Sequence, residues 1–213
     1  MYTTKPSIVY RYKNGLYVNL TNRCPTACVF CIKNKWKMDY RGNNLNLDNL
    51  EPTPVETARL AALAYAEKFF DELVFCGYGE PAMRLDAVIE TARLVKSGAA
   101  APVPARTRIR LNTNGLANLI CGRNVAPELK GLVDAVYVSL NASEPKRWAE
   151  LMRPVARYAG NGFESVKDFI RAAARLLPET VATIVECEPG EMAAFKKLAA
   201  ELGAKYKVRA RLE

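Results

Sequence analysis

Short runs rich in β-branched and aromatic residues alternate along the chain with longer stretches of helical periodicity, and this alternation limits the folds open to it. Strands separated by helices form right-handed βαβ units and predict a mainly parallel sheet. Six such units are too few for a closed eight-stranded barrel. The sequence therefore predicts an α/β fold, an open partial (β/α)6 barrel with a mainly parallel sheet, as a single domain over residues 1–213. Strands are expected at residues 16–20, 72–76, 108–112, 135–140, 181–185 and 206–212.

Helices are expected to cover this sheet. The first begins at Thr53-Pro54, where threonine can cap the helix, proline suits the first helical position and Glu56 can close a capping box. The others follow from apolar stripes at helical spacing, the last of which stops at Gly203, a residue suited to the left-handed cap position. Because ligands of such sheets gather at the carboxyl ends of the strands, we expect chemistry at the strand-to-helix junctions. The stripes are Leu85, Val88, Ile89, Ala92 and Val95; Val166, Phe169, Ile170, Ala173, Leu176 and Leu177; and Met192, Phe195, Leu198, Ala199 and Leu202.

Composition excludes several classes of chemistry. The chain has no histidine, which removes Ser-His-Asp and Cys-His nucleophiles, histidine-bound zinc and the facial triad of non-haem iron. The net charge of +9 comes from 31 basic residues spread along the chain. This charge fits either a solvated basic surface or the attraction of an anionic substrate, RNA included. Because no apolar run reaches the roughly 18 residues of a membrane span, we expect a cytoplasmic protein without membrane contact.

Cys24, Cys28 and Cys31 follow the first expected strand in a C-x3-C-x2-C spacing. In a cytosolic protein such spacing favours metal ligation over disulfide formation. Zinc with a fourth ligand from elsewhere is one interpretation, although structural zinc sites commonly show a second cysteine pair. A [4Fe–4S] cluster usually takes four thiolates, so three local ones would leave one iron open to a non-protein ligand. The single cysteines Cys76, Cys121 and Cys187 do not suggest a second cluster, and their role stays unassigned.

Polar residues also mark the ends of three later strands. After the second strand comes Gly77-Tyr78-Gly79-Glu80, a turn whose glycines let the backbone approach a ligand. Ser139 and Asn141, at the end of the fourth strand, have period-two spacing and are expected to face the same side. Ordinary turns, caps and a surface glutamate are the competing interpretation. The third strand ends in Asn112, Thr113 and Asn114.

The cysteine spacing, with the aromatic Phe30 just before the last cysteine, resembles the C-x3-C-x-φ-C signature of the radical S-adenosylmethionine (SAM) superfamily. The resemblance implies a [4Fe–4S] cluster on Cys24, Cys28 and Cys31, carried by a cluster loop at residues 21–35. It implies that the amino and carboxylate groups of SAM chelate the open iron. One electron would then split the sulfonium C–S bond and give a 5′-deoxyadenosyl radical that takes a hydrogen atom from a substrate.

The resemblance also implies where SAM binds. The turn with Gly79 and Glu80 is similar to the Gly-Gly-Glu-Pro segment that holds the methionine amino group, with Tyr78 in place of its first glycine. Arg153 could pair with a carboxylate, and an exposed arginine is the alternative. The adenine pocket is expected only as backbone near Phe30 and Val185. Ribose and the methionine carboxylate would be contacted by the strand-end residues Asn112, Thr113, Asn114, Ser139 and Asn141.

Within the superfamily, the chain looks like the TatD-associated radical SAM proteins, a label that names a gene association and no reaction. The likeness covers most of the chain. It is carried by residues 17–25, 47–53, 74–81, 110–115, 138–141 and 208–211.

Residues 33–52, with Trp36, Tyr40 and Arg41, are a candidate lid or substrate loop, because radical chemistry requires that water be excluded. A structured surface crossing is the alternative. The substrate is not identified: a nucleotide or RNA suits the basic charge, and a peptide or small molecule fits as well. A reductant such as ferredoxin or flavodoxin is implied. Two other functions stay open, namely an iron–sulfur electron-transfer protein and a zinc-stabilised nucleic-acid-binding module.

Overall fold

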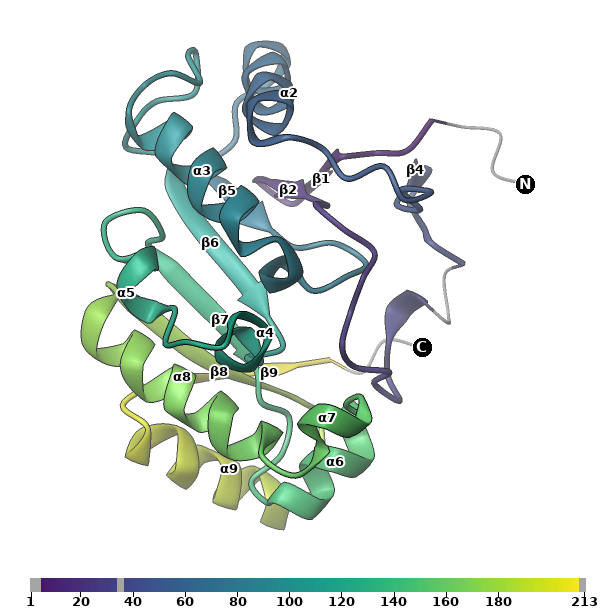
Figure 1. Ribbon diagram of the computed structural model, residues 1–213, viewed down its shortest axis with the longest axis vertical. Coiled ribbons are helices and arrows are strands. Elements are labelled where there is room, and N and C mark those ends of the chain that lie inside the picture. Colours follow the sequence, from purple (N-terminus) through teal and green to yellow (C-terminus); the bar gives the residue numbers. More distant parts are fainter. Residues whose placement is uncertain (1–4, 34–36, 211–213) are drawn as a thin grey trace. The chain divides into compact units, whose positions relative to one another are not determined.

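The computed structural model describes residues 5–33 and 37–210. Its strands form one seven-stranded sheet in the order β1-β2-β5-β6-β7-β8-β9, and β3 and β4 form a separate small sheet (Figure 1). β1 pairs antiparallel with β2, whereas β2–β5, β5–β6, β7–β8 and β8–β9 are parallel. The predicted α/β fold with an open, mainly parallel sheet is therefore confirmed. The strands are β1 (Val9–Tyr12), β2 (Gly15–Val18), β3 (Asp39–Tyr40), β4 (Asn43–Asn44), β5 (Glu72–Phe75), β6 (Arg108–Thr113), β7 (Ala135–Ser139), β8 (Glu179–Val185) and β9 (Lys205–Arg209).

Two of the helix ends lie where the sequence carries the predicted cap signals. Thr53 caps the first helix by accepting a hydrogen bond from the Glu56 amide, as predicted, and Gly203 follows the last one with a left-handed φ of 74°. No helix in the described part of the chain is long and apolar enough to span a membrane. The helices are α2 (Pro54–Glu67), the 3₁₀ helix η1 (Pro81–Arg84), α3 (Leu85–Lys96), α4 (Ala117–Cys121), α5 (Ala126–Leu129), α6 (Pro145–Met152), α7 (Ala156–Ala159), α8 (Gly162–Leu176) and α9 (Pro189–Glu201).

The antiparallel strand β1 was not expected from periodicity. It forms a hairpin with β2 in which Tyr12 pairs with Gly15 across the two residues Lys13 and Asn14. Lys13 has a positive φ of 53°, as the tight turns of two-residue hairpins require. The Asn14-Gly15 dipeptide was the available sequence signal for a hairpin, although Gly15 is the first paired residue of β2 and only Asn14 lies in the loop. At the other end of the sheet, the expected strand 206–212 is observed as β9, and its last two residues lie outside the described part of the chain.

The chain divides into two compact units, which we describe separately. The first unit comprises residues 1–23, 32–111 and 132–134, and the second comprises residues 24–31, 112–131 and 135–213. β6 runs through both, since its first four residues belong to the first unit and its last two to the second. The single-domain prediction is not tested by this division and stays a prediction.

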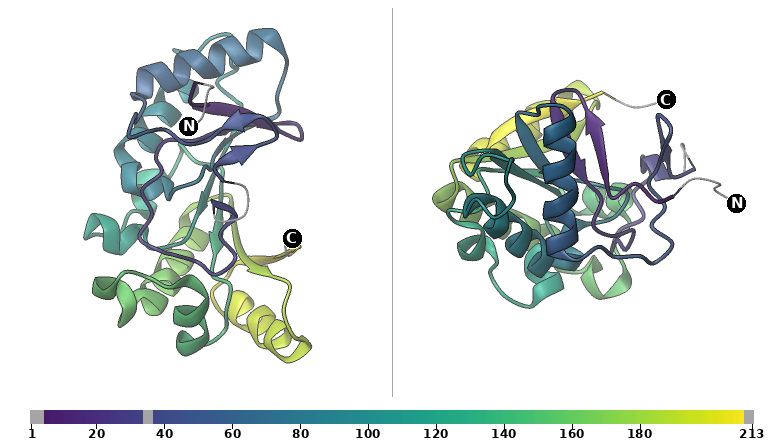
Figure 2. Two further views of the ribbon diagram at one scale, coloured as in Figure 1. Left: turned by 90° about the vertical axis from the view of Figure 1, so that its right-hand side faces the viewer. Right: turned by 90° about the horizontal axis from the view of Figure 1, so that it is seen from above.

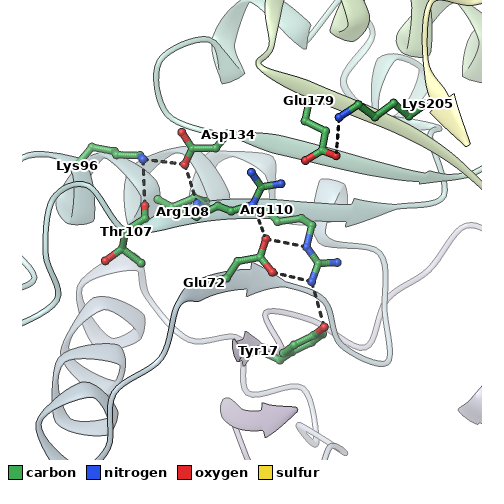
Figure 3. Close-up of polar contacts among 10 residues, drawn as sticks. Tyr17, Glu72, Lys96, Thr107, Arg108, Arg110, Asp134, Glu179 and Lys205 are labelled. Atoms are coloured by element: carbon green, nitrogen blue, oxygen red, sulfur yellow. Dashed lines mark hydrogen bonds and ion pairs between the residues drawn. The ribbon is translucent and has the colours of Figure 1, made fainter. Parts of the chain in front are cut away.

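In the first unit, β2, β5 and β6 present an apolar and a polar face. Leu16, Leu73 and Ile109 share one register row and are essentially inaccessible to solvent. The opposite face carries an ion-pair network (Figure 3). There Arg110 donates two hydrogen bonds to the Glu72 carboxylate, at 3.0 and 2.9 Å, and a third to the Tyr17 hydroxyl at 3.1 Å. On this face, therefore, the charges of Arg110 and Glu72 are paired with each other.

In the second unit, β7, β8 and β9 follow one another in the sheet in the order in which they occur in the chain. Successive right-handed crossovers in one direction place α8 and α9 on the same face of these strands (Figures 1 and 2). Val136, Val138, Ala182 and Ile184 lie on that face and are fully buried. The opposite face of the strands carries the polar residues discussed below.

Candidate cluster and cofactor site

Residues 24–31, which hold the three predicted cluster ligands, are fixed to the second unit by backbone hydrogen bonds. The amides of Ala27 and Val29 donate to the carbonyls of Arg153 and Leu151, at 3.0 and 2.9 Å. In return the amide of Val155 donates to the carbonyl of Pro25 at 2.9 Å. The segment 151–155, which includes the last two residues of α6 and those that follow it, therefore holds this loop in place. Sequence reasoning missed this support, because it singled out Arg153 for its side chain and not for its backbone.

The three thiols occupy one short loop. Cys24 is exposed, whereas Cys28 and Cys31 are half-buried, and the Cys31 amide donates to the Cys28 carbonyl at 3.0 Å. The hydroxyl of Thr26 lies between two of them, 3.2 Å from the sulfur of Cys24 and 3.4 Å from that of Cys28. The pKa of Cys28 is raised to about 11, chiefly by burial and to a smaller extent by the neighbouring Cys24 and Cys31, which together outweigh the lowering effect of the hydrogen bond with Thr26. Cys28 is therefore a neutral thiol at pH 7 unless a metal stabilises its thiolate.

The donor set consists of three thiols, the ligand type of iron–sulfur clusters. Within the described residues, no three cysteine, aspartate or glutamate side chains converge closely enough to hold one metal ion. In a [4Fe–4S] cluster each thiolate binds a different iron atom. The three sulfurs, supplied by eight consecutive residues, thus fit the group that the sequence predicts.

Two residues from other elements lie against the thiols. The side-chain amide of Asn114, just beyond the end of β6, lies 4.0 Å from the sulfur of Cys24, and its oxygen accepts from the Leu116 amide. Met152, at the end of α6, places its sulfur 3.7 Å from that of Cys28. Asn114 was a predicted site residue and is found beside a predicted ligand. Met152 was missed, since a buried methionine carries no signal beyond core packing.

Asn141 joins several strand ends. It has a left-handed φ of 61°, and its side-chain oxygen accepts from the Val185 amide at 3.2 Å and from the Arg209 guanidinium at 2.9 Å. Its amide nitrogen donates to the Met152 sulfur at 3.2 Å and to the Ser139 carbonyl at 3.3 Å. The structure therefore brings the predicted residues Ser139, Asn141 and Val185 together. It adds Arg209, which the sequence analysis did not single out as a site residue.

The other predicted site residues of the second unit differ in their exposure to solvent and in their contacts. Asn112 is half-buried at the end of β6, and the hydroxyl of Thr113 is engaged by the Gly115 amide at 3.0 Å. Phe30 is half-buried on the cysteine loop. Arg153 is exposed and ends α6 in a left-handed conformation with a φ of 44°. Their contacts to SAM stay predictions.

In the first unit, the turn after β5 is shaped by packing against the chain that leads into Cys24. A Cβ atom on Gly79 would lie 2.2 Å from the Thr21 carbonyl oxygen and 2.7 Å from that of Arg23. The Glu80 amide donates to the same Arg23 carbonyl at 2.9 Å, and its carboxylate caps η1 by accepting from the Ala82 amide. Glycine is therefore needed here for close approach of two backbone segments. The turn fixes the residues that precede the cluster loop.

Tyr78 and Glu80 are both core residues of the first unit. The Tyr78 side chain is buried with Tyr10 and Leu45, and its hydroxyl donates to the Asp39 carbonyl at 3.0 Å. Glu80 is 2 % exposed. Their predicted contact with SAM would thus have to come mainly from the backbone of this turn.

Glu51 is a second support for the residues before Cys24, and sequence reasoning did not identify it. Its carboxylate accepts from the Thr21 hydroxyl and from two nitrogens of Arg23, at 2.8 and 2.9 Å, and lies 3.5 Å from Arg84. Burial by itself raises the pKa of Glu51, but the hydrogen bonds from Arg23 and Thr21 outweigh it and leave the pKa below its usual value. A cleft of about 450 Å³, lined by Arg23, Glu51 and residues 46–49 among others, lies beside this network.

The predicted lid or substrate loop, residues 33–52, contains the β3–β4 hairpin. Tyr40 lies edge-on to Tyr10 and Tyr12, with ring centroids 5.7 and 6.0 Å away. Arg41 places its guanidinium 5.7 Å from the Tyr40 ring centroid. Trp36 lies outside the described residues. The loop therefore contains ordered aromatic contacts, and its role as a lid stays a prediction.

The family model of the radical SAM superfamily matches residues 18–186, a region that includes all three cluster cysteines. No curated protein sequence matched significantly. Among solved structures, the chain is similar to a radical SAM methyltransferase from Sphaerobacter thermophilus, with a TM-score of 0.54 and 17% identity over 95% of this chain and 68% of that one. At that identity the likeness concerns the fold alone. The chain belongs to the radical SAM superfamily.

Proposed function

We propose that this protein is a radical SAM enzyme that binds one [4Fe–4S] cluster through Cys24, Cys28 and Cys31. The observation that carries the proposal is the three-thiol loop inside the matched family region. A chain without histidine has thiolates as its natural ligands for iron. When bound, the cluster and SAM would supply a 5′-deoxyadenosyl radical for hydrogen abstraction from a substrate.

The protein's own contribution is to hold the thiols and to shape the space beside them. Backbone bonds from Leu151, Arg153 and Val155 fix the loop without using the thiols. The side chains of Asn114 and Met152 lie against Cys24 and Cys28, respectively. This arrangement supports a cofactor site at the carboxyl ends of β6 and β7, where ligands of parallel sheets bind.

We assign SAM contacts as the family resemblance implies. The backbone of Tyr78-Gly79-Glu80 would hold the methionyl group, and the backbone near Phe30 and Val185 would receive adenine. Arg153, exposed at the end of α6, is available to a carboxylate. The ribose and carboxylate contacts would come from Asn112, Thr113, Asn114, Ser139 and Asn141.

The finer identity is also a proposal. We place the chain among the TatD-associated radical SAM proteins, in the cytoplasm, with ferredoxin or flavodoxin as the reductant and residues 33–52 as the lid. The substrate is a nucleotide, RNA, a peptide or another small molecule, and the net charge of +9 favours an anionic one.

The test is anaerobic reconstitution with iron and sulfide, followed by electron paramagnetic resonance of the reduced protein with and without SAM. We expect a [4Fe–4S]⁺ signal that changes when SAM is added. Cys28→Ala should lose the signal, whereas Cys187→Ala, a control at an exposed cysteine outside the loop, should keep it. A signal indifferent to SAM would instead mean an electron-transfer protein, and bound zinc without a cluster would mean a zinc-stabilised nucleic-acid-binding module.

A further inference from the structure

The cysteine loop and the segment 151–155 form a short antiparallel ribbon in the second unit. Thr26 and Pro154 are bridge partners, and backbone hydrogen bonds of 3.0 and 2.9 Å between the two segments flank this bridge on either side. Side chains that alternate along such paired segments point to opposite faces. The ribbon therefore has two faces, and the contacts of its side chains show what each face carries.

One face of the ribbon carries thiols. The Thr26 hydroxyl lies 3.2 and 3.4 Å from the sulfurs of Cys24 and Cys28, respectively. Met152 adds its sulfur to the same group, 3.7 Å from that of Cys28. These contacts agree with the alternation, because Cys24, Thr26 and Cys28 are spaced two residues apart. The proposed cluster would therefore be bound on this thiol face.

The opposite, outer face of the ribbon is apolar and exposed to solvent. Ala27 and Val29 alternate with the residues of the thiol face, and both are exposed. Val155, which follows the bridge residue Pro154, lies on the outer face as well. Val29 is 44 % and Val155 42 % exposed, and with Ala27 between them along the ribbon they form one apolar row. Contiguous exposed apolar side chains, unlike scattered ones, mark interaction surfaces.

The surroundings of this apolar row are positively charged. Residues 24–31 and 151–163 contain two arginines but no aspartate or glutamate. Arg157, two residues after Val155, is exposed on α7, where its guanidinium lies 4.6 Å from the ring centroid of Tyr158. Among the described residues, no carboxylate forms an ion pair with Arg157. Its charge is thus not neutralised within the described part of the chain, and it complements an acidic partner.

The outer face lies directly behind the thiols. Val29 is the chain neighbour of Cys28, and consecutive Cα atoms are about 3.8 Å apart. Only the backbone of the ribbon therefore separates the two faces. Because layers of strands pack about 10 Å apart, a protein seated on the outer face would approach the thiols to about this distance. SAM and a substrate would bind on the thiol face, so a protein on the outer face leaves their site open.

We propose that a small acidic electron-donor protein docks on the outer face, which comprises Ala27, Val29, Val155 and Arg157. The inference rests on the proposed function, because cleavage of SAM requires one electron from the cluster. The docked donor is oxidised by one electron and the cluster is reduced by one, to [4Fe–4S]⁺, with no bond formed or broken. A small apolar centre beside a charge suits electron-transfer encounters, which bury little surface and are steered by charge.

The first measurement is binding of oxidised flavodoxin, an acidic flavoprotein that donates single electrons, to the reconstituted protein by isothermal titration calorimetry. We expect Arg157→Glu and Val29→Glu each to weaken binding roughly five- to tenfold at low ionic strength, and Arg157→Gln to have an intermediate effect. Binding by the wild type should weaken as salt is added. The matched control is Arg175→Glu, which should bind as the wild type does. Arg175 is exposed in the last turn of α8, at the end that leads into the amino-terminal end of β8.

The second measurement is stopped-flow reduction of the cluster by flavodoxin hydroquinone. Arg157→Glu and Val29→Glu should be reduced roughly five- to tenfold more slowly than the wild type, because fewer encounters lead to docking. Dithionite, a small reductant that needs no docking surface, should reduce the wild type and the variants at similar rates. That result would show that each variant carries an intact cluster.

Four results would overturn the assignment. They are the absence of flavodoxin binding, equal binding by the wild type and the outer-face variants, an equal loss in Arg175→Glu, and binding that does not depend on ionic strength. The paramagnetic resonance experiment on the same samples keeps the two proposals apart. A normal response to SAM without docking on the outer face refutes only this inference, whereas reduction through the outer face without a response to SAM refutes only the radical SAM assignment.

Discussion

The contact of Gly79 with the chain before Cys24 gives the sharpest prediction. A methyl group added in Gly79→Ala would meet two backbone carbonyl oxygens, at 2.2 and 2.7 Å. Overpacking usually costs 1–3 kcal/mol, and we expect about 3 kcal/mol here because backbone cannot yield as a flexible side chain does. For a chain of this size, that lowers the melting temperature by roughly 6–12 °C.

Circular dichroism melting of the cluster-free protein under argon measures this change. The control is Gly160→Ala, because a Cβ atom at Gly160 would have no neighbour within 4 Å. We expect the control to melt within about 2 °C of the wild type, as for a surface change without strain. Because Thr21 and Arg23 lead directly into Cys24, Gly79→Ala should also bind less iron after reconstitution. Unchanged melting and iron content in Gly79→Ala would refute the role that we give to this turn.

Three further predictions concern polar networks and can be followed by urea unfolding. Glu51→Gln should lower the free energy of unfolding by about 1 kcal/mol near pH 7. Because folding lowers the pKa of Glu51, this advantage of the wild type should vanish as the pH falls below about 4. A difference between the two proteins that stays constant with pH would contradict the prediction. Asn141→Ala should cost about 2–4 kcal/mol through lost hydrogen bonds and the left-handed φ, and Asn141→Gly should cost less; the reverse order would exclude backbone strain. Arg110→Met should lower the free energy of unfolding by about 2 kcal/mol. In the double variant, the added Glu72→Gln should offset part of this loss, whereas losses that simply add would show that the two residues are not coupled.

Most of the fold follows from local pattern. The expected strands at residues 72–76, 108–112 and 135–140 are observed within one residue at each end, because strands buried on a helix-covered face must be apolar. The helix start at Thr53 was predictable from capping chemistry, which depends only on neighbouring residues. β1 was missed because it is short and its pairing is decided by a turn rather than by periodicity.

The candidate site could be predicted less completely from the sequence than the fold. The three cysteines were identified by their spacing, which is local information. The contacts of Glu51 and Met152 could not be predicted in this way, because neither residue belongs to a recognisable motif. Glu51 is 28 positions from Arg23 and 30 from Thr21 in the chain, and Met152 is 124 positions from Cys28. For Glu80 the motif predicted contact with a ligand, but it did not predict that the carboxylate also caps η1.

The cysteine loop is held in position mainly by its backbone. If side chains anchored the loop, the thiols would compete with the groups that fix it. Instead, backbone bonds to Leu151, Arg153 and Val155 fix residues 24–31, and the Arg23 carbonyl before them accepts from Glu80. Main-chain groups thus set the position of the loop, and that position does not depend on the three thiols.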